Sequence, residues 1–421
     1  MSAAARTVEH VTCLGCGCAC DDITVVVQRG RVTEAQQACA LGTAWFGDGQ
    51  VPDAVRIRGR ADTLERALAE AAQLLADAKG PLVYLAGDIS CEVQRDAVAI
   101  ADRLKGAIDS LASTAAAGVL AAQRRGRAGA TLGELRQRAD LVVFWGVDPG
   151  ARYPRYNARY AVEPVGLAVP AGRQSRRVIA VDVGDARGPA DADGRVAIPP
   201  DAELDAIGAM RAMVQGRAVP PDGPFGTAIA LVQEMTKARY VAVVADAEPG
   251  PTPPPDPDRA EALIALAQAL NGPTRCALST LRGGGNRSGA DAVLTWQTGF
   301  PFAVDFGRGY PTYRPHAGAA ERLAAGEVDA ALVIGAPATL PDSVAGRLAG
   351  VATIAIGPRA SAAGWKPVVA VDTGVAGIHE GGTAFRMDDV PLPLRPAFDG
   401  ADVRSAAATV RALRERLEGA A

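Results

Sequence analysis

Four cysteines close to the start of the chain have the spacing of a metal-cluster ligand set. Cys13, Cys16, Cys20 and Cys39 form the pattern C-x2-C-x3-C-x18-C. Thiolates bind iron or zinc, and three neighbouring thiolates can wrap one side of a cubane cluster while a fourth closes the other side. The spacing therefore predicts a 4Fe-4S cluster, whose ordinary chemistry is electron transfer.

The same four thiols leave two other interpretations open. Zinc accepts four thiolates equally well, although structural zinc sites more often use two C-x2-C knuckles, and this segment has one. The site could also be inherited and empty of metal. Cys18 is a fifth cysteine inside the motif, so the identity of any single ligand stays open. We expect the remaining cysteines, Cys91 and Cys276, to pack in apolar surroundings.

A hairpin must bring the fourth cysteine back to the first three. Residues 23–27 are β-branched or apolar, Arg29-Gly30-Arg31 supplies a turn, and Val32 begins a return strand. This pattern is typical of a β-hairpin. It predicts that Cys39 lies near the loop that holds Cys13, Cys16 and Cys20.

The rest of the chain reads as alternating strands and helices. Short apolar runs bounded by Gly, Asp or Pro recur at residues 82–86, 141–145, 178–183, 240–245, 331–334, 351–356 and 367–371. Stretches with helical spacing lie at residues 63–76, 91–104, 203–213 and 261–270. Continuous apolar strands are typical of parallel sheets covered on both faces, so the expected fold class is α/β with doubly wound sheets. Ligands bind such sheets at the carboxyl ends of the strands.

Size and charge limit the classes of function. With 421 residues and 48% hydrophobic content, the chain can form two or three domains. A formal net charge of −3 predicts no nucleic-acid or anionic-membrane partner. No apolar run is long enough to span a bilayer and no signal peptide is visible, so we expect a cytoplasmic protein. Five of the seven cysteines lie within residues 13–39, which favours metal binding over disulfides. The proline-rich residues 248–257 predict an extended surface connection.

Seen with its surroundings, the cysteine segment resembles a known family. The run from Cys13 to Ile23 together with Cys39-Ala40-Leu41-Gly42 is similar to the B-type subunit of formylmethanofuran dehydrogenase, a tungsten- or molybdenum-pterin protein. The resemblance covers essentially the whole chain. Its further segments are residues 131–146, 154–160, 282–286, 295–301, 304–311 and 380–387.

The resemblance implies a molybdopterin-oxidoreductase-like fold, as in domains 1–3 of formate dehydrogenase and DMSO reductase. It places a small cysteine-rich, iron-sulfur-type domain at residues 1–55. A first doubly wound α/β lobe is expected at 56–172 with 346–421, and a second at 173–345. Candidates for a vestigial pterin pocket are Gly146, Asp148, Gly283, Gly284 and Asn286.

The chain departs from the family at the residues that would bind the metal. The family holds its metal through a cysteine or selenocysteine followed by histidine, but the corresponding residues 113–118 read Ser-Thr-Ala-Ala-Ala-Gly. A soft thiolate suits tungsten or molybdenum, and neither a methyl group nor an unactivated hydroxyl replaces it. Ala40 also stands where relatives often carry a basic residue. We therefore expect no tungsten- or molybdenum-pterin, and no residue is assigned a catalytic role.

The resemblance then points to one branch of the family, the bacterial formyltransferase/hydrolase complexes of methylotrophs. These move a formyl group from tetrahydromethanopterin to a methanofuran-like carrier and release formate, a step of one-carbon metabolism in formaldehyde oxidation. The expected role is a non-redox structural subunit, with hydrolase, formyltransferase and β-helical subunits as partners. Zinc hydrolysis by this chain itself is disfavoured, because its three histidines, His10, His316 and His379, are widely separated.

Two alternatives remain open. The chain could be an active dehydrogenase subunit whose metal is held by an unusual ligand such as Ser113 or Asp109, or it could be an iron–sulfur electron carrier. A dense group of aromatic residues is expected to serve lobe packing or a subunit interface, and we favour the interface. Its members are Trp296, Phe300, Phe302, Phe306, Tyr310 and Tyr313.

Overall fold

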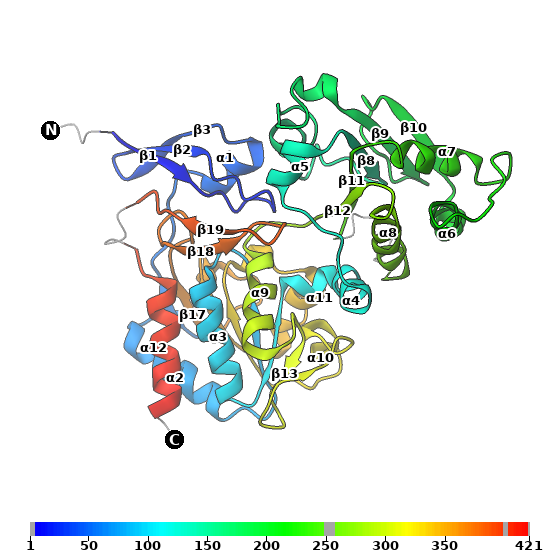
Figure 1. Ribbon diagram of the computed structural model, residues 1–421. Helices are drawn as coiled ribbons and strands as arrows, with labels where there is room; N and C mark the ends of the chain where they lie inside the picture. Colours follow the sequence, from blue (N-terminus) through cyan, green and yellow to red (C-terminus); the bar gives the residue numbers. More distant parts are fainter. Residues whose placement is uncertain (1–4, 248–256, 399–402, 420–421) are drawn as a thin grey trace. The chain divides into compact units, whose positions relative to one another are not determined.

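The computed structural model describes residues 5–247, 257–398 and 403–419 (Figure 1). They divide into two compact units: unit 1 spans Met1–Ser113 and Gly283–Ala421, and unit 2 spans Thr114–Arg282. Most of the proline-rich run predicted as a surface connection lies outside the described residues. Among those described, no helix is both long and apolar enough to cross a bilayer.

Unit 1 contains a nine-stranded sheet with the order β14-β13-β7-β6-β15-β16-β17-β4-β5. The middle strands, β7 to β17 in this order, are parallel, and the outer pairs are antiparallel. Their bounds are β4 Val55–Ile57, β5 Arg60–Ala61, β6 Pro81–Leu85, β7 Ala107–Ser110, β13 Val304–Asp305, β14 Thr312–Tyr313, β15 Ala330–Ile334, β16 Ala352–Gly357 and β17 Val369–Asp372.

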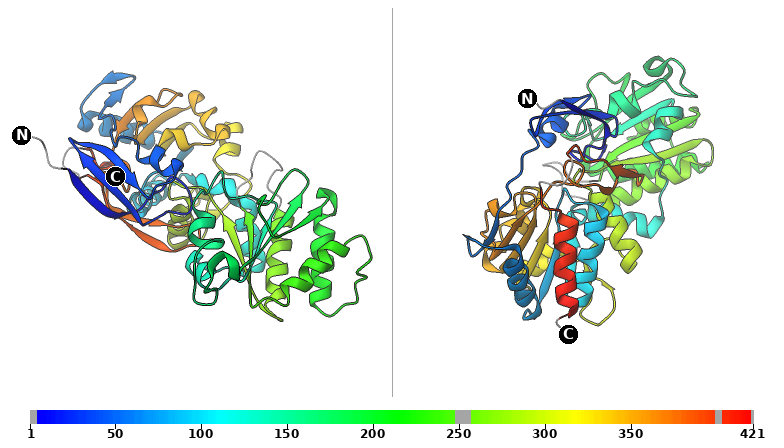
Figure 2. Two further views of the ribbon diagram at one scale, coloured as in Figure 1. Left: turned by 90° about the horizontal axis from the view of Figure 1, so that it is seen from above. Right: turned by 90° about the vertical axis from the view of Figure 1, so that its left-hand side faces the viewer.

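Helices cover both faces of this sheet because its strands are apolar on both sides. In β6, Val83 and Leu85 belong to one core cluster while Leu82 and Tyr84 belong to another, as the alternation of side chains along a strand requires. The first cluster includes α2, α3, α9 and α12, and α12 lies against both α2 and α3 (Figure 2). The helix bounds are α2 Leu64–Ala76, α3 Cys91–Arg103, α9 Arg287–Thr298, α10 Ala319–Ala324, α11 Asp342–Ala345 and α12 Ala406–Gly419.

The cysteine-rich segment forms a small separate sheet in unit 1. Strands β1 (Arg6–Val11), β2 (Ile23–Gln28) and β3 (Arg31–Gln36) pair antiparallel, and α1 (Ala40–Phe46) follows. The hairpin predicted from residues 23–32 is thereby confirmed. A further antiparallel pair consists of β18 (Gly382–Phe385) and β19 (Pro391–Leu394).

Unit 2 contains a wholly parallel five-stranded sheet with the order β10-β9-β8-β11-β12. The strands are β8 Leu141–Trp145, β9 Arg177–Val183, β10 Gly194–Ile198, β11 Tyr240–Asp246 and β12 Arg275–Leu281. The helices are α4 Ala116–Arg125, α5 Leu132–Arg138, α6 Glu203–Val214, α7 Gly226–Met235 and α8 Pro257–Leu270, with a π-helical turn at Asn157–Ala161. Every strand predicted in this region is present, so the α/β fold class is confirmed.

The boundaries between the units differ from those expected. The sequence placed them after residues 172 and 345, whereas the chain divides after Ser113 and after Arg282. The reason is strand pairing: β8 hydrogen-bonds to β9 and β11, and β15 hydrogen-bonds to β6 and β16. The direction of winding reverses between β6 and β15 in unit 1 and between β8 and β11 in unit 2. Such reversals open a crevice at the carboxyl ends of the strands.

Candidate functional site

The cysteine loop is closed by its own backbone. The amide of Cys13 donates to the carbonyl of Cys20 at 2.9 Å, and Ala19 donates to Cys16 at 3.1 Å. Cys39 precedes α1, and its Sγ accepts from the amide of Gly42 at 3.4 Å. A Cβ built on Gly42 would lie 3.4 Å from Cys13 Sγ and 3.9 Å from Cys39 Sγ. The hairpin therefore brings the fourth cysteine to the loop.

The four thiols interact electrostatically. Burial raises the pKa of Cys13, and the charges of Cys16, Cys20 and Cys39 raise it further. Burial therefore disfavours a bare thiolate at Cys13, and a cation such as iron or zinc would compensate that charge. In the part of the chain that the structure describes, no three His, Cys, Asp or Glu side chains form a single-ion site. A cubane cluster has no such requirement, because each thiolate binds a different iron, and the four-thiol donor set fits it.

The glycine-rich segment packs against the cysteine loop. Gly285 donates its amide to the carbonyl of Leu14 at 2.8 Å. A Cβ built on Gly284 would lie 2.2 Å from that same carbonyl oxygen and 2.7 Å from the amide of Cys16. Close approach of two backbones is a reason for glycine that requires no ligand. The close packing therefore gives Gly284 a structural role, whether or not it belongs to a vestigial pterin pocket.

Asn286 is also bound into the fold of unit 1. It has a φ of +64°, donates from Nδ2 to the carbonyl of Ile89 at 2.9 Å, and accepts from the amide of Phe385 at 2.9 Å. Asparagine tolerates this left-handed conformation better than most residues. Its side-chain amide joins the segment after β6 to β18.

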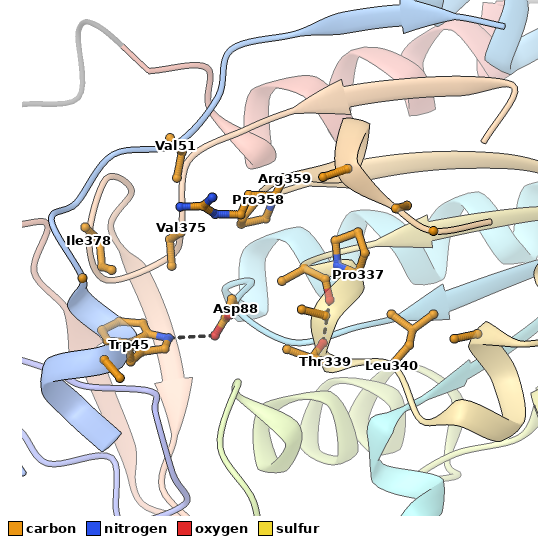
Figure 3. Close-up of a pocket in the computed structure, with 18 of the residues that line it drawn as sticks. Trp45, Val51, Asp88, Pro337, Thr339, Leu340, Pro358, Arg359, Val375 and Ile378 are labelled. Atoms are coloured by element: carbon orange, nitrogen blue, oxygen red, sulfur yellow. Dashed lines mark hydrogen bonds between the residues drawn. The ribbon is translucent and has the colours of Figure 1, made fainter. Parts of the chain in front are cut away.

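A cavity of about 800 Å³ lies at the point where the winding of the unit 1 sheet reverses (Figure 3). Its walls come from the segments that follow β6, β15 and β16, and from the C-terminal half of α1. The residues that line it include Trp45, Asp88, Thr339, Arg359, Val375 and Ile378. The location is where doubly wound sheets bind ligands.

Asp88 links this cavity to the cysteine loop. The indole Nε1 of Trp45 donates to Asp88 Oδ1 at 3.0 Å, as Figure 3 shows, and the amide of Asp88 donates to the carbonyl of Gly285 at 3.1 Å. Burial raises the pKa of Asp88, and the bond from Trp45 lowers it. Helix α1 begins after Cys39 and contains Trp45, so one short helix serves both the thiol group and the cavity wall.

Two polar side chains of the cavity wall are used within the fold. Thr339 Oγ1 accepts from Gly87 at 2.8 Å and donates to Ala336 at 2.7 Å, so its hydroxyl is used within the fold. His379 is buried, and its Nδ1 accepts from Val375 at 3.1 Å while Nε2 bonds to Gly49 O at 2.8 Å. Its ring therefore serves the structure.

The remaining pterin candidates lie in unit 2. Gly146 follows β8 with a φ of +60° and donates to Val181 O at 2.7 Å, and Asp148 accepts from the amide of Gly150 at 2.8 Å. They lie at the second reversal of winding, between β8 and β11. Gly283, Gly284 and Asn286 belong to unit 1, so the structure places the five candidates in two separate units.

Ser113 and Asp109, the two alternative metal ligands, form hydrogen bonds within the fold. Ser113 donates from Oγ to the carbonyl of Ser110 at 2.9 Å. Both carboxylate oxygens of Asp109 accept backbone amides, from Ala303 at 3.2 Å and Ala319 at 2.7 Å. Burial is the main cause that raises the pKa of Asp109 to about 6. Asp109 fastens two loops to β7, which makes it a poor ligand for a metal.

Other sequence expectations have mixed outcomes. Cys91 and Cys276 are buried, as expected, and desolvation raises their pKa values to about 11 and about 12. The aromatic group divides: Phe302 and Phe306 are buried and Phe300 stacks on Tyr313 at 5.0 Å, whereas Trp296 and Tyr310 are 54% and 55% exposed. Lobe packing thus accounts for part of the group, and two members remain on the surface.

Three cavity residues, Trp45, Asp88 and Arg359, are not among the site residues predicted from the sequence. Asp88 was visible as a polar residue after a strand, and the same signal marks Arg359, which follows β16. Trp45 carried no signal, because its partner Asp88 is 43 residues away in the chain.

Comparison with known proteins gives a consistent result. No family model matches the chain. It is 31% identical over 410 residues to the B-type subunit of the tungsten-containing formylmethanofuran dehydrogenase 2 of Methanocaldococcus jannaschii, covering 94% of each sequence. The subunit of the same name from Methanococcus maripaludis is 30% identical over 408 residues, covering 92% of this chain and 93% of that one.

A solved structure is similar as well. It is a chain of the formyltransferase/hydrolase complex (FhcABCD) from Methylorubrum extorquens, crystallised with methylofuran. The two superpose with a TM-score of 0.72 at 27% identity, covering 87% of this chain and 100% of that one. Identity of this extent over nearly the full length of the curated relatives leads to one conclusion: the chain belongs to the family of formylmethanofuran dehydrogenase B-type subunits.

Proposed function

We propose that the chain is a non-redox structural subunit of a cytoplasmic formyltransferase/hydrolase complex. The complex would move a formyl group from tetrahydromethanopterin to a methanofuran-like carrier and release it as formate. One observation carries the proposal: the thiol site is built firmly into the fold, while residues 113–118 contain neither thiol nor imidazole.

The chemistry of such a complex needs no electrons. Transfer of a formyl group from one amine to another breaks one C–N bond and forms another. Hydrolysis of the resulting formamide by water gives an amine and formate, and the carbon keeps its oxidation state throughout. A subunit without a redox metal is compatible with both steps, whereas reduction or oxidation of the formyl carbon would require a two-electron centre.

The tungsten- or molybdenum-pterin of the dehydrogenases does not fit the residues present here. A ligand set for either metal would have to come from Ser113 or Asp109. The Asp109 carboxylate already accepts two backbone amides, and the Ser113 hydroxyl donates to Ser110. We therefore assign no step to this cofactor. The molybdopterin-oxidoreductase frame itself remains part of the proposal, supported by two doubly wound sheets and a cysteine-rich segment.

A 4Fe-4S cluster does fit the donor set of Cys13, Cys16, Cys20 and Cys39. When bound, it would tie the cysteine loop to the N-terminus of α1. The loop also holds Gly285 through the Leu14 carbonyl, and Gly285 in turn holds Asp88. In this role the metal stabilises one wall of the cavity and carries no electrons.

A second candidate function has an observation in its favour. The curated relatives are named tungsten-containing dehydrogenases and match the chain over more than nine-tenths of its length. An active dehydrogenase subunit would bind tungsten or molybdenum with pterin in stoichiometric amount. Metal and pterin analysis of the purified complex separates this candidate from the structural subunit.

The proposed partners are the hydrolase, formyltransferase and β-helical subunits of the same complex. Support comes from the similar solved chain, which belongs to a multi-subunit assembly. The test is to produce these subunits with and without this chain, and to assay formate release with no electron acceptor present. We expect assembly to fail without the chain, and the full complex to release formate without an acceptor. A strict requirement for an electron carrier would contradict the proposal.

A further inference from the structure

His379 bridges two segments that both line the cavity of unit 1. Its Nε2 bonds to the carbonyl oxygen of Gly49 at 2.8 Å, and its Nδ1 accepts from the amide of Val375 at 3.1 Å. Residues 47–51 follow α1 and residues 375–379 follow β17, and members of both segments, such as Val375 in Figure 3, line the cavity. One imidazole therefore joins two parts of the cavity wall.

The two hydrogen bonds fix the protonation state of the ring. A backbone N–H can only donate, so Nδ1 of His379 is the unprotonated acceptor of the Val375 amide. Nε2 then carries the ring proton and donates it to the carbonyl oxygen of Gly49. Burial lowers the pKa of His379, with the bond to Gly49 acting in the opposite direction. The folded chain therefore holds a neutral imidazole at neutral pH.

Among the described residues, the imidazole of His379 bonds to backbone groups alone. The side chain is buried, and its ring stacks on Phe398 with the ring centroids 5.1 Å apart. Charged side chains on the surrounding elements bond to other groups or are exposed. They are Asp48 with Arg31, Asp88 with Trp45, Arg359 with the carbonyl of Gln50, Asp372 with Ser361, Glu380 with Ser405 and the first amides of α12, Arg404 with Asp53, and the exposed Arg395. An imidazolium would therefore gain no carboxylate partner among the described residues, and burying an unpaired charge is costly.

Protonation of His379 would break the bridge. A second ring proton must sit on Nδ1, where it faces the N–H of Val375, so that two donors oppose each other. The ring then has to turn away from this amide. Turning also withdraws Nε2 from Gly49 and ends the stacking on Phe398.

The segment after α1 contains the backbone positions that can absorb such a change. Gly47 and Gly49 have φ values of +53° and +72°, and glycine rotates between backbone conformations that other residues resist. Gly49 also packs closely on Phe398, because an added Cβ would lie 2.5 Å from that ring. The amide of Val32 donates to the carbonyl of Asp48 at 2.9 Å, which keeps the segment attached to β3. Loss of the bridge should therefore separate residues 47–50 from the 375–379 turn, and not from the hairpin.

We infer that His379 is an acid-operated latch on the cavity: the neutral ring holds residues 47–50 against the 375–379 turn, and protonation at Nδ1 releases them. The step adds one proton from solvent and needs no other reactant. Because the pKa in the folded chain lies below its ordinary value of 6.5, the latch is closed at neutral pH and opens as pH falls through the folded value. The inference concerns access to the cavity, so it goes beyond the proposed function and does not depend on it.

The first measurement is an NMR titration of the full chain with labelled imidazole rings. The sequence contains three histidines, His10, His316 and His379, so single glutamine variants assign the signals. His316 is exposed and serves as the internal reference. We expect His379 to titrate at a lower pH than His316 and to carry its proton on Nε2 at neutral pH. Titration at the same or a higher pH, or a proton on Nδ1 at neutral pH, would overturn the inference.

Hydrogen exchange then shows whether protonation opens the latch. Protection factors, which are corrected for the pH dependence of intrinsic exchange, are measured for peptides covering residues 45–51 and 373–380. We expect both peptides to lose protection at least about tenfold as His379 titrates, while β8 and β11 of unit 2 stay protected. A local readout is needed because Asp109, whose pKa is raised to about 6, changes the stability of the whole chain in the opposite direction.

The test variant is His379→Gln, and the matched control is His316→Gln. Glutamine keeps an N–H donor for the Gly49 carbonyl but does not titrate. The acid-dependent loss of protection should disappear in His379→Gln and persist in His316→Gln, and an equal acid response in His379→Gln and the wild type would overturn the inference. If His379→Gln lacks protection at every pH, the wild type decides. Loss of protection that coincides with the titration of His379 supports the latch, and loss at a pH where His379 does not titrate overturns it.

Discussion

The cysteine loop and the segment after β7 are the two places where a redox enzyme of this family would hold metal, and they differ sharply. Around the loop, Cys13, Cys16, Cys20 and Cys39 are all present and are fixed by backbone bonds and by α1. Residues 113–118 contain neither thiol nor imidazole, and Asp109 nearby fastens other loops.

The comparison indicates that the cysteine loop has a structural role in unit 1, whether or not it carries electrons. The loop contacts the Gly285 backbone and, through it, Asp88 and the cavity. Unfolding of the cysteine loop would therefore disturb the Gly285 segment, Asp88 and the cavity wall. Residues 113–118 complete the turn after β7 and begin α4, which alanine and serine can do as well as cysteine and histidine. Substitutions in and around the two regions test this difference. They are given in order of decreasing expected effect.

Replacing a thiol ligand should have the largest effect. Cys20→Ser should abolish binding of metal at the loop and lower the free energy of unfolding by on the order of 5 kcal/mol, because metal binding is coupled to folding. Chemical denaturation and iron analysis measure both quantities.

Cys18→Ala is the matched control for the ligand variant. Cys18 is fully buried but is not one of the four predicted ligands. The substitution should keep the metal and cost about 1 kcal/mol for the small cavity. Loss of metal in Cys18→Ala with retention in Cys20→Ser would reverse the ligand assignment.

Gly284→Ala tests whether the glycine-rich segment serves packing. A Cβ there would lie 2.2 Å from the carbonyl oxygen of Leu14, so either the loop or the segment must move. We expect a destabilisation of at least about 3 kcal/mol, measured by denaturant unfolding of the purified chain.

The control for this variant is Gly208→Ala. Gly208 lies in α6, and nothing is within 4 Å of an added Cβ. Alanine should stabilise that helix by about 0.5–1 kcal/mol. Equal stability of Gly284→Ala and the wild type would contradict the packing role.

Asp109 should give the chain a pH-dependent stability. Its pKa rises from 3.8 to about 6 on folding, so between these values the folded chain binds more protons than the unfolded chain. The free energy of unfolding should therefore fall by about 2–3 kcal/mol as pH rises through this window, and level off above it.

Asp109→Asn should remove that part of the pH profile, and Asp222→Asn, at an exposed position, should leave the profile as in the wild type. Unfolding measured in urea at several pH values checks both. If Asp109→Asn keeps the wild-type slope, the carboxyl is not the group that titrates.

Trp45→Phe should have the smallest effect. It removes the indole donor to Asp88 while keeping an aromatic ring in the cavity wall. Loss of one partly buried hydrogen bond should cost about 1–2 kcal/mol. Trp296→Phe, at a 54% exposed position, should change the stability far less. If the two variants have equal effects, the Trp45–Asp88 hydrogen bond does not stabilise the connection between the cysteine loop and the cavity.

The sequence predicts the local elements well and their assembly less well. Strands such as β8 and β11 are continuous apolar runs, so their positions follow from composition. The unit boundaries depend on β15 pairing with β6 across more than two hundred residues, which no local pattern reveals. In the same way, the sequence shows that residue 284 is a glycine but does not reveal why a side chain is excluded there. Its closeness to the Leu14 carbonyl, and the Trp45–Asp88 bond, exist only once distant segments meet.

Elemental analysis of the co-purified complex for iron, zinc, tungsten and molybdenum, combined with pterin analysis, tests the proposed non-redox role most directly. A structural subunit with an inherited thiol site predicts no stoichiometric tungsten, molybdenum or pterin. It predicts iron at the cysteine site that is lost in Cys20→Ser, and formate release by the wild-type complex with no electron acceptor present. Stoichiometric tungsten or molybdenum with pterin would contradict the account.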